Sequence, residues 1–270
     1  MLYICIPVFN EAPTVGLVLW KLRKVLQEYS REYEVVIYDD GSTDGTRETL
    51  APYADVIPLT IIGSSARQGY GHALDALVRH VTTKTRYPRR DAMIVMQGDL
   101  TDQPDDITEL AKRFEGGADI IVAERATEAP MPVPVQRLRR LSAWLSRSGT
   151  LRIRQRTLVY RRAMVSLPGV TDPFGSLRLY RISLLRDLVK GRGRATVVEN
   201  DGWAANAELL LRASAYARRI ETVTSTQRFD LRPRDSRVRP WADARALFHF
   251  SRTARSLATR ATPVAPTRRA

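Results

Sequence analysis

A short apolar run that stops abruptly in polar residues constrains this chain most. The sequence VVIY at residues 35–38 leads into DDGSTDGT at residues 39–46. An unbroken apolar run fits a strand covered on both faces in a parallel sheet better than a half-exposed antiparallel strand. The polar residues then lie at the carboxyl end of the strand, where open α/β sheets bind ligands. Turn formation and helix capping by Ser42 or Asp44 explain this segment equally well.

The same alternation of apolar runs and helical periodicity extends along the chain. Strands are predicted at residues 2–8, 35–40, 56–62, 92–96, 118–123 and 220–223, and helices near residues 15–26, 44–51, 104–114 and 203–213. Strand followed by helix followed by strand implies right-handed crossovers and parallel pairing. We therefore expect an α/β fold, a Rossmann-like and mostly parallel sheet with helices on both faces.

Carboxylates follow three of these strands, and they should meet at one edge of the sheet. They are Glu11, Asp39, Asp40, Asp99 and Asp102. Clustered acids are unfavourable unless a cation lies among them, and a hard divalent ion held by carboxylates and substrate phosphates is the usual arrangement. We expect Mn²⁺ or Mg²⁺ as the cofactor. Helix capping explains Asp102 equally well.

The charge is distributed unevenly along the 270 residues. Residues 1–124 contain 13 Lys and Arg against 19 Asp and Glu, whereas residues 125–270 contain 30 against 10. A basic half suggests a phosphate-bearing partner, although solvated arginines explain part of the excess. The basic half has no nucleic-acid-binding motif and no aromatic residues interleaved with its arginines, so we expect no nucleic acid partner.

Two predicted helices in the basic half are amphipathic. The first helix has Leu138, Leu141 and Leu145 on one side and carries Arg137, Arg139, Arg140 and Arg147. The second helix starts near Trp241 and carries Arg245, Arg252 and Arg255. Such helices can lie on an anionic membrane surface, but covering a sheet with snorkelling arginines is commoner. The lone Cys5 indicates a reducing compartment. We expect a cytoplasmic protein, with peripheral attachment at the inner face of the membrane as the membrane-bound alternative.

Taken in order, the motifs resemble those of glycosyltransferase family 2, the inverting nucleotide-sugar enzymes of GT-A fold. The matching segments are PVFNE at residues 7–11, DDGSTDGT at 39–46, RQGYG at 67–71 and GDL at 98–100. The segment DPFGSLRL at 172–179 looks like the one that follows in the polyprenyl-phosphate sugar synthases. The resemblance covers about residues 2–230.

The resemblance implies a set of site residues. A nucleoside diphosphate sugar would be bound by Pro7, Phe9, Glu11, Asp40, Gly69 and Gln97, with Arg228 and Arg232 on its diphosphate. Asp99 would be catalytic as the metal ligand, and Arg125 and Arg139 would hold an acceptor phosphate. Glu208 lies where members that glycosylate hydroxyls carry a general base, and a structural carboxylate is the alternative.

Two positions depart from the family pattern. Gln97 stands where the Asp-x-Asp motif has its first carboxylate, and Thr101 stands where the polyprenyl branch has a glutamine that helps to hold the metal. Asp99 is therefore the one carboxylate that matches the metal position.

The expected activity is inverting transfer of a hexose to an acceptor, most plausibly a polyprenyl phosphate. A phosphate with a second pKa near ~6 is largely dianionic at neutral pH and needs little help from a general base. Two alternatives stay open: transfer to a soluble or saccharide hydroxyl, which would need Glu208, and a catalytically degenerate nucleotide-binding protein, which Gln97 suggests.

We expect one transferase domain followed by an appendage. The domain would span residues 1–230, with a nucleotide-binding half at 1–124 and an acceptor half at 125–230. A basic loop and amphipathic helix would follow at 231–261, and a disordered tail at 262–270. The sequence leaves the base, the sugar and the oligomeric state open.

Overall fold

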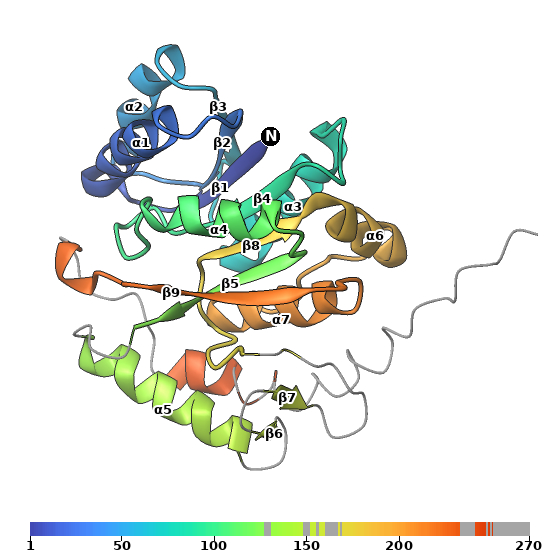
Figure 1. Ribbon diagram of the computed structural model, residues 1–270. Coiled ribbons are helices and arrows are strands. Elements are labelled where there is room, and N and C mark those ends of the chain that lie inside the picture. The colour runs from blue at the N-terminus through green and yellow to red at the C-terminus, as the bar shows by residue number, and fades with distance from the viewer. Residues whose placement is uncertain are drawn as a thin grey trace, which may run out of the picture.

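A seven-stranded sheet forms the centre of the molecule in the computed structural model (Figure 1). The structure describes residues 1–126, 131–147, 152–154, 157–159, 167, 169–232, 241–246, 248 and 250. The strand order is β3-β2-β1-β4-β8-β5-β9. The bounds are Leu2–Val8 for β1, Tyr33–Asp40 for β2, Leu59–Ser64 for β3, Ala92–Val95 for β4, Ile120–Arg125 for β5, Arg178–Arg181 for β8 and Ile220–Ser225 for β9.

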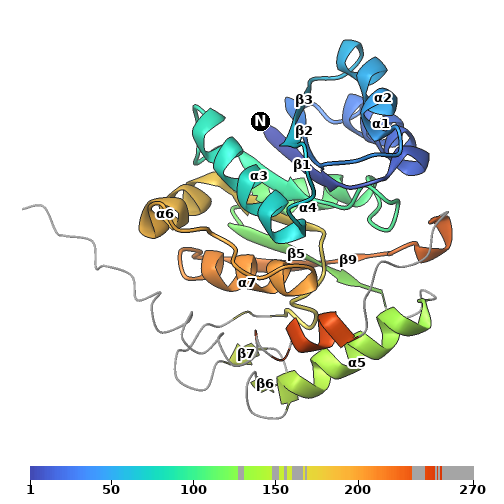
Figure 2. The same cartoon turned by 180° about the vertical axis from the view of Figure 1, so that it is seen from behind.

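Helices cover both faces of this sheet, as expected (Figures 1 and 2). They are α1 Ala12–Gln27, α2 Thr46–Leu50, α3 Tyr70–Lys84, α4 Asp106–Glu115, α5 Val133–Arg147, α6 Ile182–Arg192 and α7 Trp203–Ser214, with 3₁₀ turns at Ala51–Asp55 and Phe229–Leu231. Residues 241–246 are also helical. A separate two-stranded antiparallel sheet pairs β6, Arg152–Arg154, with β7, Thr157–Val159, and neither strand was predicted.

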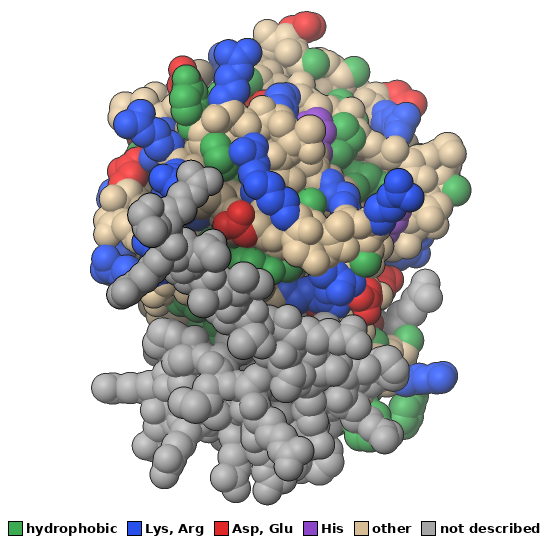
Figure 3. All heavy atoms as spheres, turned by 90° about the vertical axis from the view of Figure 1, so that its right-hand side faces the viewer, with side chains coloured by type: hydrophobic (Ala, Val, Ile, Leu, Met, Phe, Trp, Pro, Cys, Tyr) green, Lys and Arg blue, Asp and Glu red, His purple; other side chains and the backbone are tan. Residues whose placement is uncertain are grey.

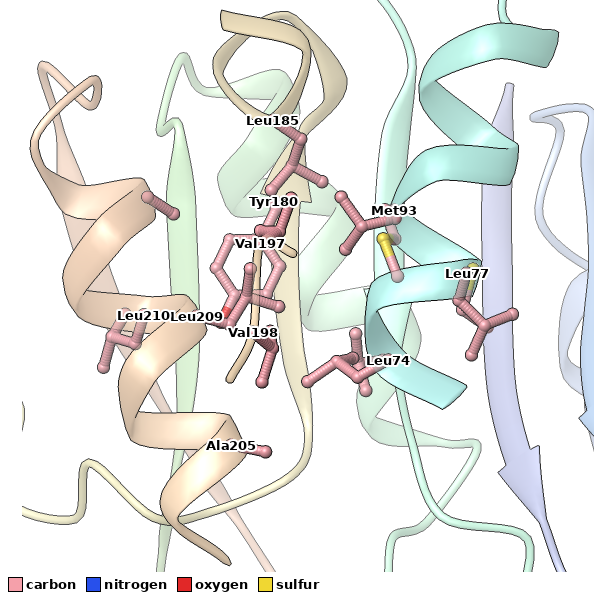
Figure 4. Packing of buried hydrophobic residues seen from close by; sticks show 14 of the residues in the cluster. Leu74, Leu77, Met93, Tyr180, Leu185, Val197, Val198, Ala205, Leu209 and Leu210 are labelled. Carbon is pink, nitrogen blue, oxygen red and sulfur yellow. The ribbon is translucent and has the colours of Figure 1, made fainter. Parts of the chain in front are cut away.

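The alternation of side chains along β1 divides the core into two layers. Leu2, Ile4 and Ile6 pack with α1 and α4, whereas Tyr3 and Cys5 belong to the layer under α3, α6 and α7. Figure 4 shows part of this second layer, where leucines of α3 and α7 meet residues of β4 and β8. The central strands of the sheet are buried on both faces, which explains the unbroken apolar runs in their sequence.

The direction of β8 brings an additional segment to the ligand-binding edge. β8 pairs antiparallel with both β4 and β5, whereas the other pairings of this sheet within the described residues are parallel. The beginning of β8 therefore lies at the same edge as the ends of its neighbours. The crossover rule did not predict this reversal.

Four predicted elements begin two or three residues later than expected, and for two of them hydrogen bonds show why. The strand predicted at 56–62 starts at Leu59, because the N–H groups of Val56 and Ile57 bond to the carbonyl oxygen of Tyr53 in a 3₁₀ turn. The helix predicted from residue 44 starts at Thr46, because the Asp44 carboxylate accepts the N–H of Thr46 from outside the helix.

Described Lys and Arg side chains are scattered over the coloured part of the face that Figure 3 shows. There, Lys and Arg side chains are interspersed with acidic, apolar and other side chains. Within the described residues, no helix has the length and apolarity needed to cross a membrane. The predicted tail at 262–270, and Arg252 and Arg255, lie outside the described residues.

Gly71 allows two distant segments to touch. A Cβ at this position would overlap the backbone carbonyl oxygen of Asn200, and the Gly71 N–H donates to the Asp201 carboxylate at 2.9 Å. The start of α3 therefore packs directly on the loop before α7. The glycine at position 71 permits this close approach of two backbone segments.

Replacing Gly71 by Ala should lower the free energy of unfolding by about 1–3 kcal/mol, because backbone atoms must move to admit the methyl group. Gly175→Ala is the matched control, since its Cβ would meet other atoms no closer than 3.7 Å. Urea unfolding of both variants measures the effect. Equal stability of the two variants would contradict the proposed overlap.

Candidate functional site

A cavity of about 630 Å³ lies at the edge where the parallel strands end. The ends of β1, β2 and β4, the segment before β8, the beginning of α7 and the segment after β9 contribute to its wall. The predicted site residues that line it are Pro7, Phe9, Glu11, Asp40, Gly69, Gln97, Asp99, Arg139 and Arg232. The structure thus gathers nine of the twelve in one place.

Several polar residues of the motif at 39–46 lock two loops together. Ser42 Oγ accepts the Asn10 N–H at 2.9 Å, Thr46 Oγ1 accepts the Glu11 N–H at 2.9 Å, and Asp44 accepts the Ala12 N–H at 3.1 Å. The loops after β1 and β2 are thereby fixed to each other. For Ser42 and Asp44, the turn interpretation was the right one.

Asp40 supports the wall of the cavity at the end of β2. One carboxylate oxygen accepts the Gln68 N–H at 2.7 Å and the other accepts the Gly69 N–H at 2.9 Å. Beside it, the guanidinium carbon of Arg67 lies 4.3 Å from the centre of the Phe9 ring. This end of the cavity therefore offers a flat aromatic and cationic surface, suited to stacking of a planar ring.

Asp99 lies at the middle of the cavity and forms an ion pair with Arg232. Its Oδ2 is 2.5 Å from Arg232 Nη2, and its Oδ1 accepts the Thr101 N–H at 3.0 Å. Both side chains of the pair are almost fully buried. Within the described part of the chain, no three His, Cys, Asp or Glu side chains are close enough together to hold a metal ion.

A divalent ion nevertheless fits the oxygen atoms around Asp99. The Gln97 side chain lines the cavity next to Asp99, and the buried Thr101 Oγ1 has no hydrogen-bond partner among the described residues. One carboxylate with neutral oxygen atoms and substrate phosphates is a donor set that Mg²⁺ accepts. Asp99 and Gln97 are the residues that would hold the ion.

Asp102 joins two segments behind the cavity. Its Oδ2 accepts both the Gln97 N–H at 3.0 Å and the Ser176 hydroxyl at 2.7 Å. Burial is the main cause that raises the pKa of Asp102 to about 6, and its hydrogen bonds to Ser176 and Gln97 lower it. Asp102 thus fixes the turn after β4 to the segment that enters β8. This role differs from both roles considered for Asp102 in the sequence, which were helix capping and metal binding.

Two arginines lie close together at the far end of the site. Arg139 lines the cavity, forms an ion pair with Asp172 and donates to Gln227 Oε1 at 3.3 Å. Burial, followed by the charge of Arg139, lowers the pKa of Arg125, and Asp172 partly offsets this. The crowding of two cations around one carboxylate leaves positive charge for an anion.

Three predicted site residues do not line the cavity. Arg125 is near Arg139 but does not line the cavity, and the exposed Arg228 pairs with Asp230 at 2.7 Å. Glu208 needs correction as a possible general base: it is fully buried and pairs with Arg212 at 2.6 Å. Its Oε2 accepts the Glu199 and Asn200 N–H groups at 2.9 and 2.8 Å, so it has the structural role that was its alternative.

Sequence reasoning missed several residues of the cavity wall. They are Tyr70, Phe174, Ser176, Asp201, Trp203, Asn206, Gln227 and Asp243. Tyr70 donates to Asn206 Oδ1 at 2.8 Å, and the buried Arg178 donates to the carbonyl oxygens of Asn206 and Pro173, both at 2.5 Å. Two features of the sequence could have indicated these residues. Asp201 lies in a loop, and Trp203 and Asn206 lie in the first turn of a helix that follows a glycine.

Glu208→Gln should lower the free energy of unfolding by about 3 kcal/mol, because it removes one partner of a buried ion pair. This value is near the low end for such a change, because Arg212 keeps its ion pair with Glu199. Glu199→Gln is the control: its side chain is 53% exposed and meets the same arginine. It should cost about 1 kcal/mol or less. Thermal and urea unfolding measure both, and a Glu208 variant as stable as its control would contradict the assigned role.

Curated relatives resemble part of the chain. An undecaprenyl-phosphate 4-deoxy-4-formamido-L-arabinose transferase of Pseudomonas aeruginosa is 27% identical over 199 residues, which covers 72% of this chain and 51% of the relative. One of the same name from Aeromonas hydrophila is 28% identical over 118 residues, covering 44% of this chain and 35% of the relative. The chain thus spans about a third to half of the length of these relatives.

Solved structures resemble nearly the whole chain. Glucosyl-3-phosphoglycerate synthase of Mycobacterium tuberculosis, in complex with Mn²⁺ and UDP-glucose, has a TM-score of 0.59 at 16% identity, covering 94% of this chain and 78% of that one. TarS of S. aureus in complex with UDP has a TM-score of 0.55 at 13% identity, covering 94% and 72%. The predicted fold class, an α/β fold of GT-A type, is confirmed.

The model of the family described as glycosyl transferase family 2 matches residues 3–189, well over half of the chain. This match includes the ends of β1, β2 and β4, which line the cavity. The chain therefore belongs to glycosyl transferase family 2.

Proposed function

We propose that this chain transfers a hexose from a nucleoside diphosphate sugar to a polyprenyl phosphate, with inversion at the sugar carbon. One observation carries the proposal. A single cavity joins a stacking and hydrogen-bonding end, at Phe9 and Asp40, through Asp99 to Arg139 with Arg125 near it. This order matches a base, a diphosphate and a second phosphate.

The donor would lie with its base near Phe9, Asp40 and Gly69 and its diphosphate near Asp99 and Arg232. The Arg67 guanidinium on Phe9 shows that a flat cation already stacks there, and a base could use the same surface. Uridine diphosphate is a reasonable first probe, because the two structural neighbours described above contain UDP or UDP-glucose.

A bound Mn²⁺ or Mg²⁺ would supply charge neutralisation for the leaving diphosphate, as in other phosphate-releasing enzymes. Arg232 adds a positive charge at the same position. When the nucleotide binds, its diphosphate would compete with Asp99 for this guanidinium. The arginine is thus able to stabilise the negative charge that builds on the leaving group.

The acceptor phosphate would bind between Arg139 and Arg125. An oxygen of the phosphate attacks the anomeric carbon from the face opposite the diphosphate; the carbon–oxygen bond to the diphosphate breaks, and its electron pair leaves with the diphosphate. A dianionic phosphate needs little or no general base. The burial of Glu208 away from the cavity is consistent with this acceptor.

The names of the curated relatives support a polyprenyl phosphate acceptor, and such an acceptor requires access to a membrane surface. Leu138 of α5 is buried in the core, whereas Arg137 and Arg140 are exposed. Arg245 is exposed on the helix at 241–246, and Trp241 is 90% exposed. These residues favour a peripheral, salt-sensitive attachment in the cytoplasm, because each arginine near an anionic leaflet contributes about 1 kcal/mol.

The function is tested by a panel of UDP-glucose, UDP-galactose, UDP-N-acetylglucosamine and GDP-mannose, each with undecaprenyl phosphate in anionic vesicles. We expect one donor to release its nucleoside diphosphate only when the lipid phosphate is present. Arg139→Gln should raise the KM for the lipid by about tenfold or more, because a charge-assisted bond is lost. Arg140→Gln, the exposed neighbour on α5, is the control.

Outcomes of this assay separate the rival functions. Release that depends on a saccharide and ignores the lipid would assign a hydroxyl acceptor. Nucleotide binding without any release would indicate a degenerate, binding-only protein. An Arg139 variant indistinguishable from the Arg140 variant would remove the acceptor assignment.

Arg232→Gln should raise the affinity for Mn²⁺ in the absence of nucleotide by about tenfold, because it frees Asp99 from a charged hydrogen bond. Asp99→Asn should abolish any Mn²⁺-dependent increase in UDP binding. Electron paramagnetic resonance of free Mn²⁺ and calorimetry with UDP measure these effects. Arg228→Gln serves as the control, since Arg228 pairs with Asp230. Unchanged Mn²⁺ binding in both Asp99 and Arg232 variants would mean that arginine alone neutralises the diphosphate.

A further inference from the structure

Ser176 occupies a distinct position on the cavity wall, beside the turn that carries Asp99. It is 3% exposed, and it lies in the segment that enters the antiparallel strand β8. Its hydroxyl and the backbone N–H of Gln97 bind the same oxygen of Asp102, at 2.7 and 3.0 Å. Ser176 is therefore fixed next to the middle of the cavity, and not near the stacking end at Phe9.

The bond to Asp102 determines what Ser176 can offer to a ligand. An ionised carboxylate only accepts hydrogen bonds, so Ser176 must donate its one hydrogen to Asp102. The oxygen that Ser176 contacts also accepts the Gln97 N–H, so this oxygen carries no proton and can only accept from the serine. The oxygen lone pairs of Ser176 remain for the cavity, and the residue acts as a hydrogen-bond acceptor.

If the diphosphate lies near Asp99 and Arg232, the transferred hexose comes next along the cavity, before Arg139. Ser176 lies in this interval because β8, which it precedes, stands between β4 and β5 in the sheet. Asn206 and Trp203 line the same cavity. Asn206 is already engaged, since it accepts from Tyr70 at 2.8 Å and donates to the Phe174 carbonyl oxygen at 3.2 Å. Hexose hydroxyls are the donor groups that an acceptor at this place would meet.

We propose that Ser176 accepts a hydrogen bond from one hydroxyl of the transferred hexose, and that Asp102 is the positioning residue that keeps Ser176 in this acceptor state. This inference rests on the proposed function and adds a determinant of sugar specificity. In this hydrogen bond the sugar hydroxyl is the donor and Ser176 is the acceptor. A substituent that cannot donate a hydrogen bond should therefore weaken binding when it replaces this hydroxyl.

The test measures the binding of the donor that the panel identifies, together with its nucleoside diphosphate, by calorimetry. Ser176→Ala should weaken the binding of the nucleotide sugar about fivefold, the value of one neutral hydrogen bond, and leave the nucleoside diphosphate within about twofold. Ser225→Ala is the matched control. It removes a buried serine that donates to a carboxylate, Asp106, at 2.5 Å, away from the cavity wall.

Deoxy and deoxyfluoro analogues of that donor then locate the hydroxyl. For the unchanged protein, one deoxy analogue should bind about fivefold more weakly, and the deoxyfluoro analogue at the same carbon equally weakly, because fluorine cannot donate. Ser176→Ala should show no further loss with either analogue. In Asp102→Asn, the amide oxygen can still accept from both Ser176 and the Gln97 N–H, so both analogues should stay equally weak. In Asp102→Ala, no acceptor holds the serine hydrogen, so the gap between the deoxy and deoxyfluoro analogues should open.

Three results would overturn the inference. The first is a Ser176 variant that binds the nucleotide sugar as tightly as the Ser225 variant does. The second is additive losses for Ser176→Ala and every deoxy analogue, and the third is a deoxyfluoro analogue that binds as well as the parent sugar. If no nucleotide sugar of the panel binds to the unchanged protein, the proposed function itself fails, and this inference fails with it.

Discussion

The position of β1 between β2 and β4 determines where everything else in this molecule can act. Strand order runs outward from β1 in both directions, with β2 and β3 on one side and β4 on the other. In open α/β sheets, a crevice forms where the strand order reverses in this way. The residues after Val8, Asp40 and Val95 border that crevice, and the dry core on both faces of the sheet holds the three strand ends in register.

Two buried carboxylates at this crevice each accept a pair of hydrogen bonds. Asp40 satisfies two backbone donors of the turn before α3, and Asp102 satisfies a backbone donor and a hydroxyl from different segments. Each carboxylate therefore holds a loop in place while its neighbours face the cavity. The acidic motifs build the rigid wall of a site as much as they supply its chemistry.

The fold and the part of the cavity at the ends of β1, β2 and β4 were predictable because the responsible residues are local in sequence. Apolar runs predicted the strands, and the polar residues directly after them, such as Phe9, Asp40 and Asp99, do line the cavity. Glu208 was misplaced as a catalytic candidate because helix position alone does not show which way a carboxylate points. Ser176 and Asn206 escaped notice because only the reversal of β8 and long-range contacts bring them to this edge.

The hydrogen bond between Asp102 and Ser176 joins positions that are 74 residues apart in the sequence. Losing the serine alone would leave a fully buried carboxylate short of a donor, at a cost of about 1–3 kcal/mol. In relatives where one of the two residues is substituted, the other should therefore tend to be substituted as well. An alignment of family sequences would then show correlated substitutions at these two positions, which would indicate the hydrogen bond without a further structure.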